Sequence, residues 1–362
     1  MRTLTTWLAL ALLSAPLFAV PTSDRCPGEG PKPLAEVPWE DNTAVALKTP
    51  TPVRDFVLFE RRGMVIYRDS NQQVFRRSVD PAGTAVPAAP SISAPLSTAH
   101  DPDERYLVAE NFPFYFDALY GRGWFDFNPP VNQPKNLFWG NGELYGMERP
   151  PEDNSPGPIH LFRYRPGSWL SWKVCRNLWV SNDQFSVAEG SRYPYLSLYK
   201  TFLTTKGHGI MLYRVNVESC GLDQPALFFD KLPGPATRVQ VVSQPYGAAI
   251  HVEQPTKKVL WYRDGACRYF DVEGGDVTIP NPDIPMFAVR NTLKLWLLDP
   301  EAERYTALRP SLPATALRDR DLTLTSDGAS VIVAPKDVDG NRRLLRIDLP
   351  KAMRRQAAAI AP

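Results

Sequence analysis

Aromatic side chains gather in one stretch of the sequence, residues 111–128, which reads NFPFYFDALYGRGWFDFN. In and just after this stretch we single out five candidate binding residues: Tyr115, Tyr120, Arg122, Trp124 and Trp139. Tyrosine and tryptophan supply large contact area at low entropic cost, and an arginine between aromatic rings suits a carboxylate or a stacked ring. The chemistry expected of this set is noncovalent binding. The alternative, a pair of core strands joined by a rigid loop, stays open.

Acidic residues recur through the same region, at Asp117, Asp126, Glu143 and Glu148. A glycoside hydrolase or lyase would need two carboxylates flanking the scissile bond. The sequence fixes no such pair at a set separation, and acids in turns commonly hold a hairpin or face solvent. We therefore predict no catalytic residue and favour a non-enzymatic protein, with the hydrolase or lyase kept as the alternative.

Metal and cofactor motifs are missing from the sequence. The four histidines, at positions 100, 160, 208 and 251, have no ligand spacing such as HExxH, and the cysteines form no CxxC pair. A Gly-x-Ser-x-Gly elbow and a glycine-rich phosphate loop are also absent. We accordingly predict neither a metal site nor a cofactor.

The first nineteen residues, MRTLTTWLALALLSAPLFA, place one arginine before an apolar run from Trp7 to Phe18. This pattern is typical of a secretory signal peptide, and we expect cleavage after Ala19, with an uncleaved anchor as the alternative. The run is too short to span a bilayer, so we predict no integral membrane span. The expected location is the periplasm or the outside of the cell.

An exported chain with four cysteines favours two disulfides. The sequence allows three pairings. We favour Cys175–Cys220, because these residues flank one repeat, which leaves Cys26 to pair with Cys267.

Charge and composition narrow the class further. The 41 basic and 39 acidic residues are spread along the chain, with no basic run of the kind that binds nucleic acid. Thirty-seven prolines argue for short strands and rigid loops over long helices. The expected partner is a protein, peptide or glycan.

The elements that would position these residues are most visible in residues 321–350, DLTLTSDGASVIVAPKDVDGNRRLLRIDLP. We predict strands at Leu322–Leu324, Ser330–Ala334 and Arg343–Ile347, joined by turns at Asp327-Gly328 and Asp339-Gly340, because Asp-Gly is a strong hairpin signal. A three-stranded meander needs copies of itself to pack against.

The copies recur with a mean spacing of about 45 residues, which fits a propeller blade of three or four strands. We interpret seven apolar segments as the closing strands of successive units, centred on Phe75, Phe125, Phe162, Tyr213, Trp261, Trp296 and Leu345. The predicted fold is all-β, a β-propeller of seven blades, with six or eight also compatible with the uneven spacing.

Two of the units resemble the TolB-type, WD-like propeller repeat, in which a Ser-x-Asp-Gly turn precedes an apolar strand. The segments 325–328 (TSDG) with 347–349 (IDL), and 101–104 (DPDE) with 106–107 (YL), carry the resemblance. The middle units match only in period, and no Trp-Asp pair closes a blade. The resemblance implies a propeller fold, which hosts many functions.

These observations divide the chain into a signal peptide (1–19), a proline-rich extension (20–52), a single propeller domain (53–350) and a tail (351–362). Ring closure would use a strand from Ala44–Val53 to complete the last blade. The function expected is a non-enzymatic exported scaffold of the cell envelope that binds a protein, peptide or glycan. A structural subunit of a larger envelope assembly is a further alternative.

Overall fold

The computed structural model is built almost entirely from β-strands. It describes the following residues: 34–38, 44–89, 91–100, 104–109, 114–117, 122–126, 135–140, 143–148, 160–164, 171–175, 186–188, 196–216, 221–242, 247–253, 258–263, 266–272, 276–281, 283–290, 295–308, 321–336 and 339–355. In this part of the chain the helical structure is 3₁₀ only, at η4 (Lys351–Met353) and at Asp321. The proline-rich composition had predicted this preference for strands over helices.

The described strands fall into seven sheets, numbered here in chain order. Sheet 1 contains β3 (Val53–Phe59), β4 (Met64–Asp69), β5 (Val74–Ser78) and β6 (Val86–Ala89). Sheet 2 contains β7 (Leu96–His100), β8 (Tyr106–Ala109), β9 (Phe114–Asp117) and β10 (Arg122–Asp126). Sheet 3 contains β11 (Lys135–Gly140), β12 (Glu143–Glu148), β13 (His160–Tyr164) and β14 (Ser171–Cys175).

Sheets 4 and 5 contain β15 (Ser186–Val187), β16 (Leu196–Thr204), β17 (Gly207–Asn216) and β18 (Gly221–Leu232), and β19 (Ala236–Val242), β20 (Gly247–Val252), β21 (Lys258–Arg263) and β22 (Ala266–Asp271). Sheet 6 contains β23 (Asp276–Thr278), β24 (Phe287–Arg290), β25 (Leu295–Asp299), β26 (Arg304–Leu308) and β1 (Ala35–Glu36). Sheet 7 contains β27 (Leu322–Leu324), β28 (Ser330–Val333), β29 (Leu345–Asp348) and β2 (Val45–Ala46).

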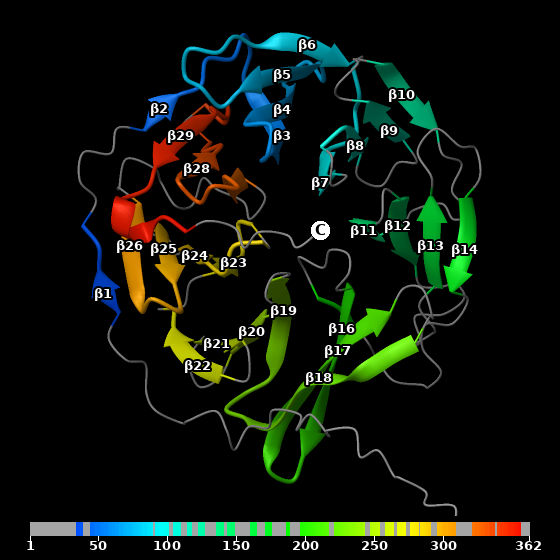
Figure 1. Ribbon diagram of the computed structural model, residues 1–362, viewed down its shortest axis with the longest axis vertical. Helices are drawn as coiled ribbons and strands as arrows, with labels where there is room; N and C mark the ends of the chain where they lie inside the picture. The colour runs from blue at the N-terminus through cyan, green and yellow to red at the C-terminus, as the bar shows by residue number, and fades with distance from the viewer. Residues whose placement is uncertain are drawn as a thin grey trace, which may run out of the picture.

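The sheets stand around a ring, with β3, β7, β11, β19 and β23 toward the centre (Figure 1). Within sheets 1 to 5 each strand pairs antiparallel with its neighbour in the chain. This arrangement confirms the predicted all-β propeller class. The blade count of the whole chain stays a prediction, because the seven sheets are counted in the described residues only.

Apolar clusters fill the space between neighbouring sheets. One cluster joins Val53, Phe56 and Tyr67 of sheet 1 to Ile332 and Leu344 of sheet 7. Further clusters join sheets 1 and 2, 4 and 5, 5 and 6, and 6 and 7. Since fully burying one such side chain contributes about 1.5–3 kcal/mol, face-to-face packing of the sheets is the main stabilising contact of the ring.

The ring is closed by strands that precede β3 in the chain. β2 pairs antiparallel with β29, and the Leu47 N–H donates to the Leu344 carbonyl at 2.9 Å. This confirms the prediction that the closing strand comes from Ala44–Val53. β1 adds a second contact that the sequence did not predict, because it pairs in parallel with β26. Figure 1 shows both strands on the outside of the ring.

The predicted C-terminal meander is present. β27 has the predicted bounds, and β28 and β29 each lie within two residues of the prediction. Gly328 and Gly340 have φ angles of +60° and +82°, the left-handed conformation for which glycine was expected in these turns. A Cβ on Gly328 would also meet the backbone of Arg355, so the turn leaves room for the C-terminal segment.

Candidate functional site

The predicted aromatic residues lie on two sheets. Tyr115 is in β9, Arg122 and Trp124 are in β10, and Trp139 is in β11. Tyr115 pairs with Phe125 in register, so the backbone brings the first three residues together on adjacent strands. β11 belongs to the next sheet and lies against β7, at the opposite end of sheet 2 from β10. The side chains of these four residues and all of Tyr120 lie outside the described part, so their binding role stays a prediction.

The predicted disulfides are covered only in part. Cys175 lies in β14 opposite Leu161, and Cys267 lies in β22 opposite Tyr262. Cys26 and Cys220 lie outside the described residues. The pairings Cys175–Cys220 and Cys26–Cys267 therefore stay predictions.

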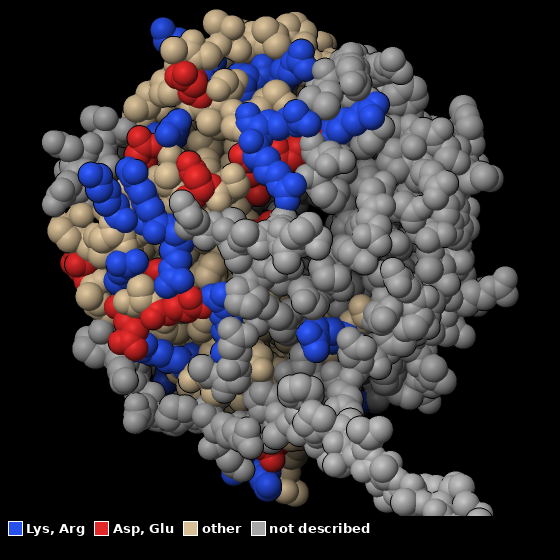
Figure 2. Space-filling view, in the orientation of Figure 1, with Lys and Arg blue, Asp and Glu red and all other residues tan. Residues whose placement is uncertain are grey.

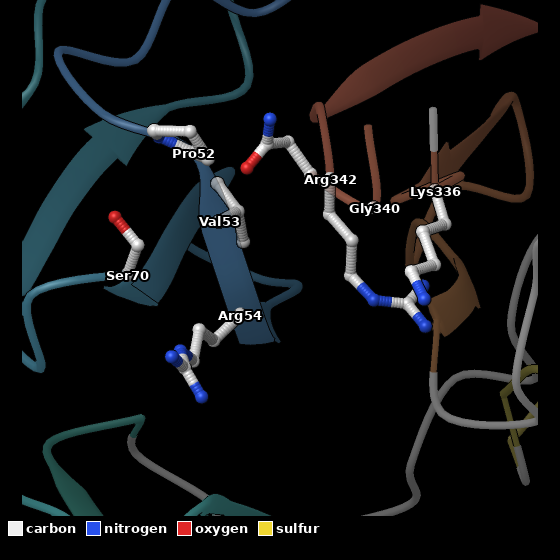
Figure 3. Close-up of a pocket in the computed structure, with 8 residues that line it drawn as sticks. Pro52, Val53, Arg54, Ser70, Lys336, Gly340 and Arg342 are labelled. Carbon is white, nitrogen blue, oxygen red and sulfur yellow. The ribbon is translucent and has the colours of Figure 1, made fainter. Parts of the chain in front are cut away.

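A crevice of about 370 Å³ lies where sheets 7 and 1 meet. Two stretches of sheet 1 form one wall, the start of β3 and the turn after β4, and the β28–β29 connection of sheet 7 forms the other. Its lining residues are Pro52, Val53, Arg54, Ser70, Lys336, Gly340, Asn341 and Arg342. Figure 3 shows Arg54 extending from β3, and Lys336 and Arg342 extending from the opposite wall. Three of the eight residues are basic and none is acidic, so we call this site the basic crevice.

Backbone hydrogen bonds fix both walls of the basic crevice. The Ser70 N–H donates to the Pro52 carbonyl at 2.9 Å, and the Val53 N–H donates to the Arg342 carbonyl at 3.0 Å. Asp69 orders the turn after β4, because its carboxylate accepts from the N–H groups of Asn71 and Gln73. The hydrogen bond between Val53 and Arg342 links the two walls and fixes their separation.

The basic side chains differ in their surroundings. Arg342 forms an ion pair with buried Asp321 and donates to the Ala334 carbonyl at 2.8 Å, which anchors its guanidinium. Lys336 is exposed, and its Cε would lie 3.2 Å from a Cβ placed on Gly340, so its stem runs over that glycine. Arg54 is exposed on the opposite wall. The crevice therefore has exposed basic side chains at Lys336 and Arg54, whereas the charge of Arg342 is balanced by Asp321.

The buried carboxylates of the described residues have structural partners. Asp55 pairs with Arg68 at 2.6 Å, and Asp299 pairs with Arg355 at 2.7 Å. Glu104 accepts from the backbone N–H groups of Arg61 and Arg62, at 2.7 and 2.8 Å. Burial raises the pKa of the Glu104 carboxyl above its ordinary value, and these two hydrogen bonds oppose the rise. Each of these acids holds a turn or a strand in place.

Two further features of the described residues bear on the site. No three His, Cys, Asp or Glu side chains among them come together as metal ligands. In the same part of the chain, none of the helical structure has the length and apolar character needed to cross a membrane.

Sequence reasoning missed the basic crevice. Lys336 and Arg342 flank the Asp339-Gly340 turn, which was recognised, but Arg54 lies far away in the sequence. Only closure of the ring brings residues 52–54 against the β28–β29 connection. The available signal was the set of basic residues around this turn (KDVDGNRR), considered together with the expected closing strand.

Comparison with known proteins gives the fold alone. No protein-family model matches the sequence, and no curated protein matches it. Solved structures do: the WD40 β-propeller domain of Doa1 is 14% identical with a TM-score of 0.52, covering 87% of this chain and 99% of that one. A chain in the crystal structure of the mitotic checkpoint complex is 14% identical with a TM-score of 0.53, covering 96% of this chain and 100% of that one. These similarities confirm a β-propeller, and the TolB-type subfamily stays a prediction.

Proposed function

We propose that this protein is a non-enzymatic scaffold that binds a protein partner. The observation that carries the proposal is the closed ring of sheets, which is similar in fold to WD40 propellers, one of them in a multiprotein complex. A rigid ring presents loops and strand ends over a large surface. A peptide and a glycan are the alternative ligands of the same scaffold.

The described acids also favour a scaffold over a hydrolase. A glycosidase needs two carboxylates poised at a scissile bond, one of them with a raised pKa. Glu104 has a raised pKa, but both of its carboxylate oxygens accept hydrogen bonds from the β3–β4 turn. Asp55 and Asp299 are likewise held in ion pairs. These carboxylates serve the fold, which supports binding as the role of the ring.

We place the scaffold in the periplasm or outside the cell, as a TolB-like protein or a subunit of an envelope assembly. The apolar segment from Trp7 to Phe18 supports export. The even number of cysteines supports an oxidising compartment, because disulfides form there and thiols in the cytosol are kept reduced. Mass spectrometry of the mature protein tests this: export predicts a chain that begins near residue 20 and has no free thiol, and an intact N-terminus with reduced cysteines would argue against it.

The partner-binding surface we propose includes Tyr115, Tyr120, Arg122, Trp124 and Trp139. The test is affinity capture from a native envelope extract with the parent protein, with the double variant Tyr120→Ala/Trp124→Ala and with Leu203→Ala. Leu203 is the matched control, because it lies in β16 and is 76% exposed. We expect the parent and the control to retain the same protein and the double variant to lose it while keeping its melting temperature.

The other outcomes separate the parts of this proposal. A parent protein that retains nothing would count against a binding scaffold and would favour the hydrolase alternative. A double variant that retains the partner would remove the aromatic residues from the binding surface. A double variant that fails to fold would show that the stretch belongs to the core.

A further inference from the structure

We propose that residues 351–355 form a releasable clasp, which opens and closes as a unit on sheets 6 and 7 while the ring stays folded. The clasp consists of η4, Arg354 and Arg355, and it follows shortly after β29 of sheet 7. Figure 1 shows η4, in red, beside β26 of sheet 6. The proposal concerns a conformational change of the chain itself, so it does not depend on a binding partner.

A buried apolar side chain anchors the clasp. Met353 is fully buried and belongs to the apolar cluster that joins sheets 6 and 7. Within the described residues the backbone hydrogen bonds of the clasp are local. The Met353 N–H donates to the Pro350 carbonyl at 2.8 Å, and the Arg354 N–H donates to the Lys351 carbonyl at 3.3 Å. In this part of the chain, side chains rather than strand pairing therefore attach the clasp to the sheets.

The Arg355 side chain locks the clasp to sheet 6. Its Nε donates to Asp299 Oδ2 at 2.7 Å and its Nη2 donates to Asp299 Oδ1 at 2.9 Å, which is the bidentate geometry that arginine favours with a carboxylate. Its Nη1 donates to Glu301 Oε2 at 2.7 Å. Asp299 ends β25, and Glu301 lies in the turn that follows and also pairs with Arg263 of sheet 5. The lock therefore connects the clasp to two sheets.

On sheet 7 the clasp lies against the Asp327-Gly328 turn. The Arg355 backbone occupies the space that a Cβ on Gly328 would need, and Gly328 has a φ angle of +60°. A larger residue at position 328 would push the Arg355 backbone away from sheet 7. The clasp thus touches both of the sheets whose contact buries Met353.

Opening of the clasp leaves the buried Asp299 carboxylate with other partners. Its Oδ1 also accepts from the N–H groups of Glu301 and Ala302, at 3.1 and 2.9 Å. Arg304 Nη2 lies 3.7 Å from its Oδ2. Loss of a partner from a buried ion pair is most costly when the remaining charge stays uncompensated. Because Asp299 keeps these contacts when Arg355 leaves, the clasp can open without unfolding of sheet 6.

The lock is accessible to dissolved ions. The Arg355 and Glu301 side chains are 26% and 28% exposed. Figure 2 shows acidic side chains among the basic ones over sheets 6 and 7. Salt screens ion pairs that are accessible to solvent. High ionic strength should therefore favour the open clasp, whereas burial of Met353 favours the closed one.

Hydrogen exchange followed by mass spectrometry tests the clasp, with the parent protein, Arg355→Gln and Arg290→Gln. Arg290 is the matched control, because it is a partly exposed arginine of sheet 6 that pairs with Asp276 at 3.4 Å. The readout is exchange of the Met353 and Arg354 amides compared with that of β4. We expect Arg355→Gln to accelerate exchange at the clasp about tenfold or more and to leave β4 unchanged, because local opening sets the exchange rate. Arg290→Gln should change neither.

Salt supplies a second arm of the same experiment. Raising sodium chloride from about 0.05 M to about 1 M should accelerate exchange at the clasp in the parent protein, because it screens the contacts of Arg355. The same change should have no effect on the clasp of Arg355→Gln, which lacks the lock. Arg355→Lys keeps the charge but not the bidentate contact, so it should accelerate exchange less than Arg355→Gln.

Three results would overturn the inference. Unchanged exchange at the clasp of Arg355→Gln would mean that Arg355 is not the lock. Equal acceleration at the clasp and in β4, or failure of Arg355→Gln to fold, would make residues 351–355 part of the cooperative core. A salt effect that persists in Arg355→Gln would assign the lock to other contacts. None of these measurements uses a binding partner, so the capture experiment and the exchange experiment can fail separately.

Discussion

At the scale of single residues, a buried ion pair connects sheet 1 to the segment that leads into sheet 2. The Asp55 carboxylate accepts from Arg68 Nη2 at 2.6 Å and from the Leu96 N–H at 3.1 Å. Arg68 also donates to the carbonyls of Ile92 and Ser93. Both charged side chains are almost completely buried. Because every charge in this network has a partner inside the protein, removing one member leaves another buried and uncompensated.

Asp55→Ala should therefore lower the free energy of unfolding by about 3–5 kcal/mol, as expected for the loss of one partner from a buried ion pair. The double variant Asp55→Leu/Arg68→Met should be less damaging than Asp55→Ala alone, because no unpaired charge remains. Chemical denaturation measures both. Asp276→Ala is the control, since it breaks an exposed pair with Arg290 and should cost under about 1 kcal/mol. Equal effects of Asp55→Ala and Asp276→Ala would refute a structural role for the buried pair.

Glu104 is a second residue whose role depends on burial. Its φ angle of +52° is close to the +60° of Gly328, which occupies the matching position in the turn of sheet 7. The Glu104 side chain reaches back to the β3–β4 turn of sheet 1, whose Glu60 carbonyl also accepts from the Ser326 hydroxyl of sheet 7. Sheets 2 and 7 thus hold the same turn from both sides.

Glu104 should give the protein a distinct dependence of stability on pH. Burial raises the pKa of its carboxyl above 4.5, so over that interval the folded state binds more protons than the unfolded state. The free energy of unfolding should therefore fall as pH rises through the folded-state pKa. Relative to Glu104→Gln, the parent should gain stability as pH is lowered from about 7 toward 4.5. Denaturation series at several pH values measure this, with exposed Glu253→Gln as the control; parallel profiles for the parent and Glu104→Gln would contradict it.

At the scale of elements, the period of about 45 residues identified the repeat but not the place of its strands. Six of the seven apolar segments taken as closing strands lie on the third strand of their sheets: β5, β13, β17, β21, β25 and β29. Phe125 lies on the fourth strand, β10, and the third strand there is β9, which contains Phe116. Third strands, like second strands, have sheet neighbours on both sides.

Elements that depend on distant parts of the chain were harder to predict. The Asp-Gly turns and the strands beside them follow from local backbone preferences, and they were predicted to within two residues. β1 has only two residues, and its parallel partner β26 is far along the chain, so no local pattern marks it. The basic crevice depends on the same kind of distant contact. What the sequence predicts here is local geometry and the repeat, whereas contacts made by ring closure need the folded structure.

At the scale of the whole molecule, one short segment protects two sheets. Residues 34–47 contain β1 and β2, which lie beside β26 and β29 at the outer edges of sheets 6 and 7. Leu47 continues this segment into the core between sheets 7 and 1. Without the segment, two strands would expose unpaired N–H and carbonyl groups, which invite association with other chains.

A chain that begins at residue 48 should consequently be less stable than one that begins at residue 34. It loses buried Leu47 and the pairing of β1 and β2, and a buried leucine alone is worth about 2–5 kcal/mol. The expected drop in melting temperature is about 5–10 °C. The shorter chain should also associate as concentration rises, which light scattering would detect. Because both chains lack residues 1–33, the difference between them reports on the closing segment, and equal melting temperatures with two monomeric chains would mean that sheet packing alone keeps the ring closed.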